Sequence, residues 1–304
     1  MSDHAFCTVL SKGRLYQALA LIASLHHVME DFRLFILCMD DDTYNLLQKI
    51  AIKNIILTHV KELENETMLA LKSQRRVNEY CWTMKPVFME RIGLQCPSFE
   101  RITYLDADLF FWDDPGVIFR NQPDCSVLLS RADIYIPPYT PSIIEQSETL
   151  LGKYNSGFIS FKRDGIGDIC LKWWKERCLE HCKEVAAKGK FGDQGYLDDM
   201  IALFPNVCEI QTPGVNKGHW NFRKHQFYIL DDKIMIDNAR LVCYHFSGFR
   251  IANKHDIVLI LNDREDPAFF YETYKNIVKL FINIVEQVEP SFNGYATKDE
   301  LKLL

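Results

Sequence analysis

The sequence has no long apolar stretch and no surplus of positive charge. No apolar run approaches the roughly 20 residues of a membrane-spanning helix, and the amino terminus lacks the basic segment, apolar core and cleavage site of a secretion signal. The net charge of −6 at pH 7 gives no electrostatic basis for nucleic acid as the main partner. We therefore expect a cytoplasmic protein with no membrane span and no nucleic-acid partner.

C-x-x-C motifs, internal repeats and linkers are also missing. The ten cysteines are scattered through apolar segments and contain no C-x-x-C pair, which predicts reduced thiols in the core. Cys178, His181 and Cys182 could share a helical face, but no complementary zinc-ligand pair of standard spacing exists elsewhere. The absence of repeats, low-complexity segments and linkers favours a single domain over residues 1–304.

What the sequence does contain is an alternation of strand-like and helix-like segments. Its 48% hydrophobic and 25% charged residues suffice for a sizeable core. The expected strands cover 5–10, 32–39 and 55–58, and the expected helices cover 15–28, 43–50, 79–94, 167–187 and 266–288. This alternation predicts an α/β fold with a mostly parallel sheet, whose ligands bind beyond the carboxyl ends of the strands.

The stretch RITYLDADLFFWDDP, residues 101–115, delivers two aspartates at the end of an apolar strand. Asp106 and Asp108 should project to one face while Ala107 turns to the other. Two carboxylates on one face repel unless a cation neutralises them, and hard cations take oxygen ligands and bridge to phosphates. A solvated turn or a helix cap is the alternative, but the apolar residues on both sides favour a clamp for a metal and a diphosphate.

Three compact polar motifs follow: YNSGF at 154–158, GDQGYLDDM at 192–200 and YHFSGF at 244–249. The Asn-Ser-Gly segment fits either an ordinary turn or a backbone that approaches a sugar closely. Asp193 and Gln194 stand at an expected helix start, where an N-cap or a contact with the reacting sugar is possible. His245 follows an apolar strand, as either a core histidine or a third metal ligand.

The order of these four motifs resembles that of the nucleotide-sugar-dependent glycosyltransferases of the GT-A fold. The resemblance is strongest to the branch with glycogenin and the bacterial lipopolysaccharide galactosyltransferases, and it spans roughly Phe6 to Arg250. The segments NEYCWTMKP, KFGDQGYLDD and PGVNKGHWN also resemble a group of uncharacterised bacterial glycosyltransferases. The resemblance implies a Rossmann-like GT-A domain with helices on both faces of a mixed, mostly parallel sheet. Its parts would be a nucleotide-binding half (1–115), a sugar and acceptor half (116–265) and a helical segment (266–304).

The resemblance also implies roles for individual residues. Mn2+ or Mg2+ would be held by Asp106, Asp108 and His245, and Asp193 and Gln194 would be catalytic. The donor, a nucleoside diphosphate sugar with UDP as the expected nucleotide, would contact Thr8, Val9, Ser11, Asp40, Asp41, Lys85, Asp106, Ala107, Asp108, Asn155, Ser156, Gly248 and Arg250. The Lys-Pro-Trp that follows the histidine in the family is absent, and FRIANKHD leaves Arg250 or Lys254 to contact the diphosphate.

The sequence therefore predicts metal-dependent transfer of a sugar to a hydroxyl of a carbohydrate, lipid-linked or protein acceptor, with retention of configuration. In an inverting enzyme, Asp193 or Asp198 would act as the base. A nucleotidyltransferase is one alternative, although the first strand-helix turn lacks a Gly-rich Lys/Arg signature. The other alternative is a carbohydrate-binding GT-A protein without catalytic activity.

Overall fold

A seven-stranded sheet forms the centre of the protein. The computed structural model describes residues 4–184, 190–259 and 268–297. The strands are β1 (His4–Leu10), β2 (Arg33–Cys38), β3 (Ile55–His59), β4 (Arg101–Leu105), β6 (Val127–Arg131), β7 (Tyr154–Lys162) and β8 (Val207–Glu209). They are ordered β3-β2-β1-β4-β7-β6-β8, and β7 is antiparallel to both neighbours while the other pairs are parallel. The predicted mixed, mostly parallel sheet is confirmed.

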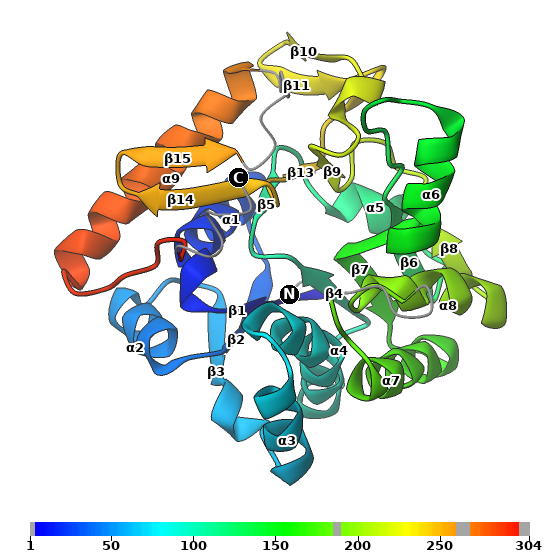
Figure 1. Ribbon diagram of the computed structural model, residues 1–304, viewed down its shortest axis with the longest axis horizontal. Coiled ribbons are helices and arrows are strands. Elements are labelled where there is room, and N and C mark those ends of the chain that lie inside the picture. The colour runs from blue at the N-terminus through cyan, green and yellow to red at the C-terminus, as the bar shows by residue number, and fades with distance from the viewer. Residues whose placement is uncertain (1–3, 185–189, 260–267, 298–304) are drawn as a thin grey trace.

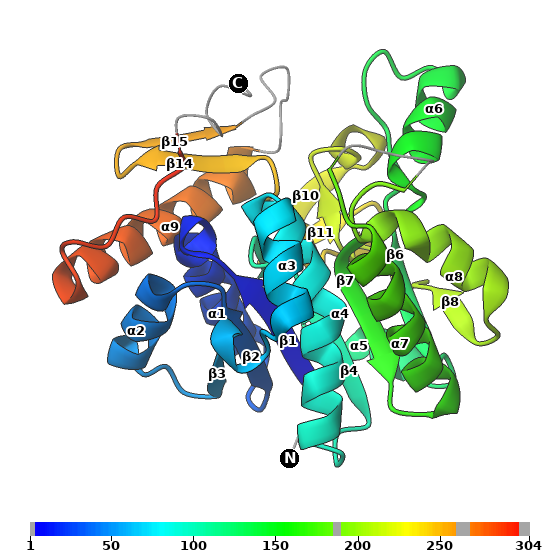
Figure 2. The same ribbon diagram turned by 60° about the horizontal axis from the view of Figure 1, so that its bottom comes forward.

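Helices cover both faces of this sheet. They are α1 (Leu15–Val28), α2 (Asp41–Ile50), α3 (Glu66–Gln74), α4 (Val77–Gln95), α5 (Gly116–Asn121), α6 (Pro141–Leu151), α7 (Gly165–Glu180), α8 (Leu197–Leu203) and α9 (Ala268–Val288). On one face α4 and α7 lie side by side (Figure 2), and on the other α9 packs on α1 (Figure 1). None of the helices within the described ranges is long and apolar enough to cross a membrane.

Capping and core packing explain why the helices begin and lie where they do. Asp40 accepts a hydrogen bond from the backbone N–H of Thr43 at 2.8 Å and so caps α2. Trp174 is fully buried and stacks on Phe161. Its neighbour Trp173 packs in the same core, so both tryptophans are core anchors, as the sequence predicted.

Short strands outside the central sheet bring distant segments together. β5 (Leu109–Phe111), β13 (Cys243–His245) and β9 (Lys217–Gly218) form one small sheet, with β13 in its middle (Figure 1). The other short strands are β10 (Phe227–Leu230), β11 (Lys233–Ile236), β12 (Ala239–Arg240), β14 (Phe249–Asn253) and β15 (Asp256–Leu259). Because β5 directly follows the two aspartates, the small sheet places the YHFSGF motif beside them.

Two sequence predictions about local structure are wrong. The helix expected to reach residue 187 ends at Glu180, since His181 has an extended backbone; residues 185–189 lie outside the described residues. The YNSGF segment is not a turn but the start of β7, where the register against β6 shifts. The helix expected at 266–288 is confirmed as α9 from Ala268, while residues 266 and 267 lie outside the described residues.

The expectation of uniformly reduced cysteines is also wrong. Cys125 and Cys208 form a disulfide, and the other eight cysteines are free. The disulfide joins Cys125, which precedes β6, to Cys208 in the neighbouring parallel strand β8. In this strand pairing, Leu128 of β6 lies opposite Cys208. Two cysteines 83 positions apart are brought together by this strand pairing, which a sequence pattern does not reveal.

Candidate active site

Two carboxylates and one imidazole converge at the carboxyl edge of the sheet. The Nε2 atom of His245 lies 2.9 Å from Oδ1 of Asp108 and 3.6 Å from Oδ2 of Asp106. One ligand atom from each residue can be chosen so that all three lie within 4.8 Å of one another. Asp108 and His245 are buried and Asp106 is partly exposed, so the cluster opens to solvent on the Asp106 side.

A tight turn, rather than the strand itself, presents the two aspartates. β4 ends at Leu105, and the N–H of Leu109 donates to the carbonyl of Asp106 at 3.1 Å. The expectation that the pair shares a strand face is therefore corrected, although both carboxylates still face His245. The buried Ala107 lies between them in this turn. Antiparallel pairing places His245 opposite Leu109, which delivers the imidazole to the same point.

A buried amide fixes the orientation of the His245 ring. Its Nδ1 lies 3.0 Å from Oδ1 of Asn216, and the Asn216 amide donates to Oδ1 of Asn155 at 2.9 Å. An amide oxygen can only accept, so Nδ1 carries a proton in this contact and Nε2 faces the carboxylates. Asn216 lies in the PGVNKGHWN segment, but the sequence did not predict it as a site residue. Its backbone φ of +51° is one that Asn tolerates better than most residues.

Gly157 is required because the His245 ring packs against the backbone of β7. A Cβ at this position would lie 2.5 Å from Cε1 of His245. The group that approaches this backbone closely is the His245 ring, and the expected approach of a sugar stays a prediction. The carbonyl of Gly157 also accepts from the N–H of Asp106 at 2.8 Å, so one residue positions both sides of the cluster.

Lys85 is a buried cation between two carboxylates. Its Nζ lies 3.0 Å from Oδ1 of Asp106 and 3.1 Å from Oδ2 of Asp193 and donates to Ser156 Oγ at 3.1 Å. Burial alone would lower the pKa of Lys85, but Asp106 and Asp193 raise it above its ordinary value, so the ammonium stays charged. Tyr104, which the sequence reading missed, also donates to Asp106, at 3.0 Å.

Asp193 and Gln194 lie next to this group, but not in the capping role that their motif favoured. Asp193 stands at the start of a short 3-10 helix and makes no side-chain cap; its carboxylate faces Lys85 instead. Burial raises the pKa of Asp193, and Lys85 only partly offsets it. The Gln194 amide accepts from Asn155 at 3.3 Å and donates to the Leu151 carbonyl at 2.7 Å.

The residues expected to hold the nucleoside are divided between the strand interior and its edge. Thr8 and Val9 are buried within β1. Ser11 and Asp40 lie just beyond the carboxyl ends of β1 and β2, where Asp40 also accepts from the Lys12 N–H at 2.9 Å. Asp41 is exposed, with Oδ1 2.7 Å from both Nε2 of His59 and Nζ of Lys61.

Arg250, rather than Lys254, lies on the side of the aspartates. Both Arg250 and Arg14, which the sequence reading missed, lower the pKa of Asp108. Lys254 is 3.4 Å from Glu286 on α9. Gly248 lies near His219, where an added Cβ would be 3.1 Å from Nδ1.

His245 and Asp108 shift each other's titration. Burial would raise the pKa of Asp108, but His245 holds it well below its usual range. Burial would likewise lower the pKa of His245, but Asp108 raises it. Each residue therefore favours the ionised form of the other, and the two buried charges compensate each other when both are present.

The donor set suits a divalent metal ion. Two carboxylate oxygens and one imidazole nitrogen are ligands that Mn2+ accepts, and Mg2+ takes the oxygens in particular. Asn216 supplies the outer hydrogen bond that metal-binding histidines almost always have. Within the described residues, no other group of three such side chains is close enough to hold an ion.

Comparisons with other proteins find two relatives in Bacillus subtilis. The chain is 54% identical to the uncharacterised protein YfnF over 300 residues, which cover 98% of this chain and 99% of YfnF. It is 29% identical to the uncharacterised protein YfnD over 305 residues, covering 98% and 96% of the two chains. No family model matches the sequence.

Solved structures with a similar fold are glycosyltransferases. The galactosyltransferase LgtC, solved with donor and acceptor sugar analogues, aligns with a TM-score of 0.56 at 12% identity over 99% of this chain and all of LgtC. GlyE of Streptococcus pneumoniae aligns with a TM-score of 0.54 at 13% identity, over 98% of this chain and 66% of GlyE. At such low identity the likeness shows the fold, which is GT-A.

Proposed function

The chain belongs to the same family as Bacillus subtilis YfnF and has the GT-A fold, and we propose that it transfers a sugar from a nucleoside diphosphate donor to an acceptor hydroxyl. The observation that carries this proposal is the convergence of Asp106, Asp108 and His245 at the carboxyl edge of the sheet. In open α/β sheets this edge is where ligands bind. The solved glycosyltransferases of this fold support a nucleotide sugar as the donor, and we propose UDP as its nucleotide.

Asp106, Asp108 and His245 would hold Mn2+ or Mg2+. A cation bound there supplies a Lewis acid that stabilises the negative charge of the leaving diphosphate. Lys85 fixes the Asp106 carboxylate in place, and Asn216 keeps Nε2 of His245 directed at the aspartates. Arg250 and Arg14 add positive charge near Asp108, which would help to stabilise a diphosphate bound there.

The nucleoside would lie along the adjoining edge of the sheet. Ser11 and Asp40 stand at the carboxyl ends of β1 and β2 and present polar groups to it. Thr8 and Val9 are buried, so they would shape this edge from below. Ala107 would leave room for the donor beside the carboxylates. Gly248, which follows β13, would leave room for it in the same way.

Asp193 and Gln194 would act on the transferred sugar from the other side of Lys85. We propose that Gln194, joined to Asn155, orients the sugar ring, as in a retaining transfer. Asp193 is bound to Lys85, so its contribution would be to keep Lys85 and Ser156 in position. An inverting mechanism with Asp193 as base would need this ion pair to open.

Nucleotide binding and donor turnover test the proposal. Titration of UDP by calorimetry should show tight binding with Mn2+ or Mg2+ and much weaker binding in excess chelator. Asp106→Asn and Asp108→Asn should abolish the metal-dependent part. Asp113→Asn is the matched control, because Asp113 lies in the same segment but pairs with Arg240 at 3.4 Å. Equal UDP binding with and without metal would contradict the clamp.

The same assay separates the two alternatives. A nucleotidyltransferase would release pyrophosphate from a nucleoside triphosphate and a sugar phosphate, whereas a glycosyltransferase releases UDP from a UDP-sugar. A carbohydrate-binding protein without activity would bind metal and nucleotide but hydrolyse no donor. A panel of UDP-sugars with and without Mn2+ therefore distinguishes the three functions.

A further inference from the structure

The hairpin of β10 and β11 leaves an apolar strand at the edge of a sheet. The sheet order is β10-β11-β12, and β10 lies at the rim of the molecule (Figure 1). The sequence of β10 is FYIL, without a charged residue or a proline. Exposed edge strands usually carry such residues, because an unprotected edge pairs readily with another strand. The composition of β10 is therefore that of a strand that pairs on both sides.

Three consecutive side chains of β10 are exposed. The exposed fractions are 39% for Tyr228, 58% for Ile229 and 51% for Leu230. Phe227, at the start of the strand, instead packs against the rings of Tyr244 and Phe270. The exposed apolar surface of the strand is thus confined to its outer part, while its inner end fixes the hairpin to the body of the protein.

The turn of the hairpin determines which backbone groups of β10 face outward. The two aspartates of the turn, at 231–232, have φ of +49° and +59°, as a two-residue type I′ turn requires. Such a turn makes Leu230 part of a hydrogen-bonded pair with β11, and these pairs alternate along the strand. Tyr228 and Leu230 therefore bond to β11, whereas the N–H and C=O groups of Phe227 and Ile229 point to the outer edge. Within the part of the chain that the structure describes, these outward groups have no backbone partner.

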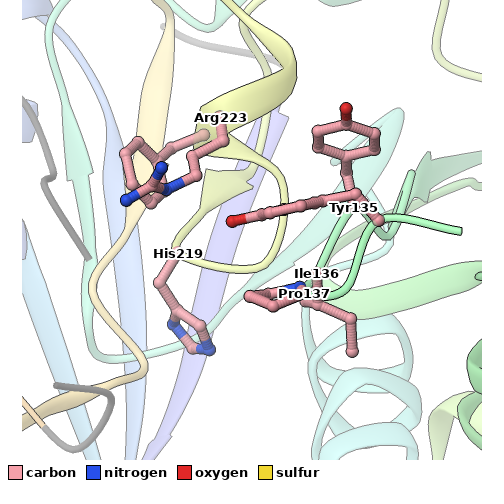
Figure 3. Close-up of a pocket in the computed structure, with 7 residues that line it drawn as sticks. Tyr135, Ile136, Pro137, His219 and Arg223 are labelled. Carbon is pink, nitrogen blue, oxygen red and sulfur yellow. The ribbon is translucent and has the colours of Figure 1, made fainter. Parts of the chain in front are cut away.

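The segment that leads into β10 is fixed in place. The side-chain N–H groups of Trp220 and Asn221 donate to the carbonyl of Ala132, at 2.7 and 2.9 Å. Arg223 and Tyr135 line a space of about 10 Å³ (Figure 3), which has room for about one water molecule. The hairpin therefore stands on a preformed base, and pairing at its edge does not have to order this base first.

We propose that β10 pairs with β10 of a second copy of this chain, antiparallel about a two-fold axis at Tyr228. Phe227 of one copy then lies opposite Ile229 of the other, and each such pair exchanges both of its backbone hydrogen bonds. The edge is self-complementary, because the outward donors and acceptors of one copy match those of the other. The exposed apolar side chains are buried by the same contact. This inference does not depend on the proposed glycosyl transfer.

The charges at the two ends of β10 favour the antiparallel arrangement. The turn at 231–232 is acidic, and residues 223–224, before the strand, are Arg-Lys. Antiparallel pairing in this register sets Asp232 beside Lys224 of the second copy, and opposite charges across a strand pair stabilise it. Lys224 also contacts Asp133, but its side chain is 46% exposed and its ammonium has further donors. Parallel pairing would instead bring the two acidic turns together.

The oligomeric state in solution tests the proposal. In sedimentation equilibrium, the mass of the full chain should rise with concentration toward that of two copies, with a dissociation constant in the micromolar range, as a small interface allows. Ile229→Lys places a charge in the contact and should raise this constant by about tenfold or more, because a two-fold dimer contains the change twice. Leu203→Lys is the matched control, since Leu203 on α8 is 62% exposed and lies outside the hairpin.

Two further variants separate backbone pairing from charge. Ile229→Pro removes an N–H that points away from β11, so the hairpin keeps its own hydrogen bonds while the dimer loses some of its hydrogen bonds. It should weaken the dimer and leave the circular dichroism spectrum unchanged. Asp231→Asn combined with Asp232→Asn keeps the turn, because Asn tolerates a positive φ, and should weaken the dimer by removing the acidic charge.

Two results of sedimentation would overturn the proposal. One is the mass of a single chain at every concentration up to about 100 μM, and the other is a dimer that both Ile229→Lys and Ile229→Pro leave intact. Flotation with vesicles of phosphatidylcholine and phosphatidylglycerol is measured on the same proteins. Vesicle binding by a single-chain protein that is lost in Ile229→Lys would show that β10 contacts lipid and not a second copy.

Discussion

The side chain of Asn216 holds the imidazole of His245 through a 3.0 Å contact between Oδ1 and Nδ1. Both side chains are buried, and Asn216 is fixed in turn by Asn155. The contact determines which ring nitrogen faces Asp106 and Asp108. The proposed metal site therefore depends on a residue that is not itself a ligand.

Asn216→Ala should weaken Mn2+ binding by about 10- to 100-fold, because the imidazole loses its orienting partner. Calorimetric titration of Mn2+ measures the affinity, and the imidazole 15N shifts report the tautomer. The control is Asn206→Ala, since exposed Asn206 has a similar backbone conformation, with φ of +56°. If both variants lose affinity equally, the backbone rather than the contact is responsible.

Gly157→Ala should displace the His245 ring, because the new Cβ would lie 2.5 Å from Cε1. We expect a loss of about 1–3 kcal/mol in the free energy of unfolding together with weaker Mn2+ binding. Urea unfolding and Mn2+ titration measure the two effects. Gly165→Ala is the control, since an added Cβ there meets nothing within 4 Å. A Gly157→Ala protein with unchanged Mn2+ affinity would rule out the predicted clash.

Lys85→Met should reduce the free energy of unfolding by about 3–5 kcal/mol, because Asp106 and Asp193 would lose their buried partner. Adding Asp193→Asn should recover part of the loss, as expected for residues in contact. Lys175→Met, which breaks a more exposed pair with Glu90, should cost less than about 1 kcal/mol. Urea unfolding of the four proteins is the measurement, and equal losses for both lysines would contradict a special role for Lys85.

The ion pair of Asp108 and His245 should give stability a defined pH dependence without metal. The raised pKa of His245 contributes stability below about pH 6.5 that is lost as pH rises through its folded-state pKa. The lowered pKa of Asp108 contributes stability above about pH 4 that is lost as pH falls through its folded-state pKa. The pair should therefore stabilise the metal-free protein most between these limits.

Without metal, the contribution of His245 to stability falls as pH rises. Bound metal should have the opposite effect, because only the neutral imidazole binds a cation. Stabilisation by Mn2+ should grow as pH rises through the pKa of His245, as measured by urea unfolding from about pH 5 to pH 8 with Mn2+ or chelator. His245→Gln should flatten both profiles. Equal stabilisation by Mn2+ at both ends of the range would show that His245 is not a ligand.

Local sequence patterns predicted the parts of this molecule that depend on neighbouring residues. The alternation of apolar segments predicted a mostly parallel sheet. The apolar residues around Asp106 and Asp108 predicted the strand end at which they lie, which is the carboxyl end of β4. The motif left Asp193 either a helix cap or a contact with the sugar, and its ion pair with Lys85 was missed because Lys85 lies on a distant helix. The Cys125–Cys208 disulfide was missed for the same reason, since it depends on the pairing of β6 with β8. The role of Asn216 likewise appears only once β9 lies beside β13.

The site is complete only after β13 has paired with β5 during folding. This pairing joins the segment after β4 to a segment near the carboxyl-terminal part of the chain, and closing so large a loop has an entropic cost. Fragments that end before β13 lack the imidazole, however complete their sheet. Mn2+ binding should therefore appear late during refolding, after sheet formation, and a stopped-flow metal signal would time the arrival of β13 at β5.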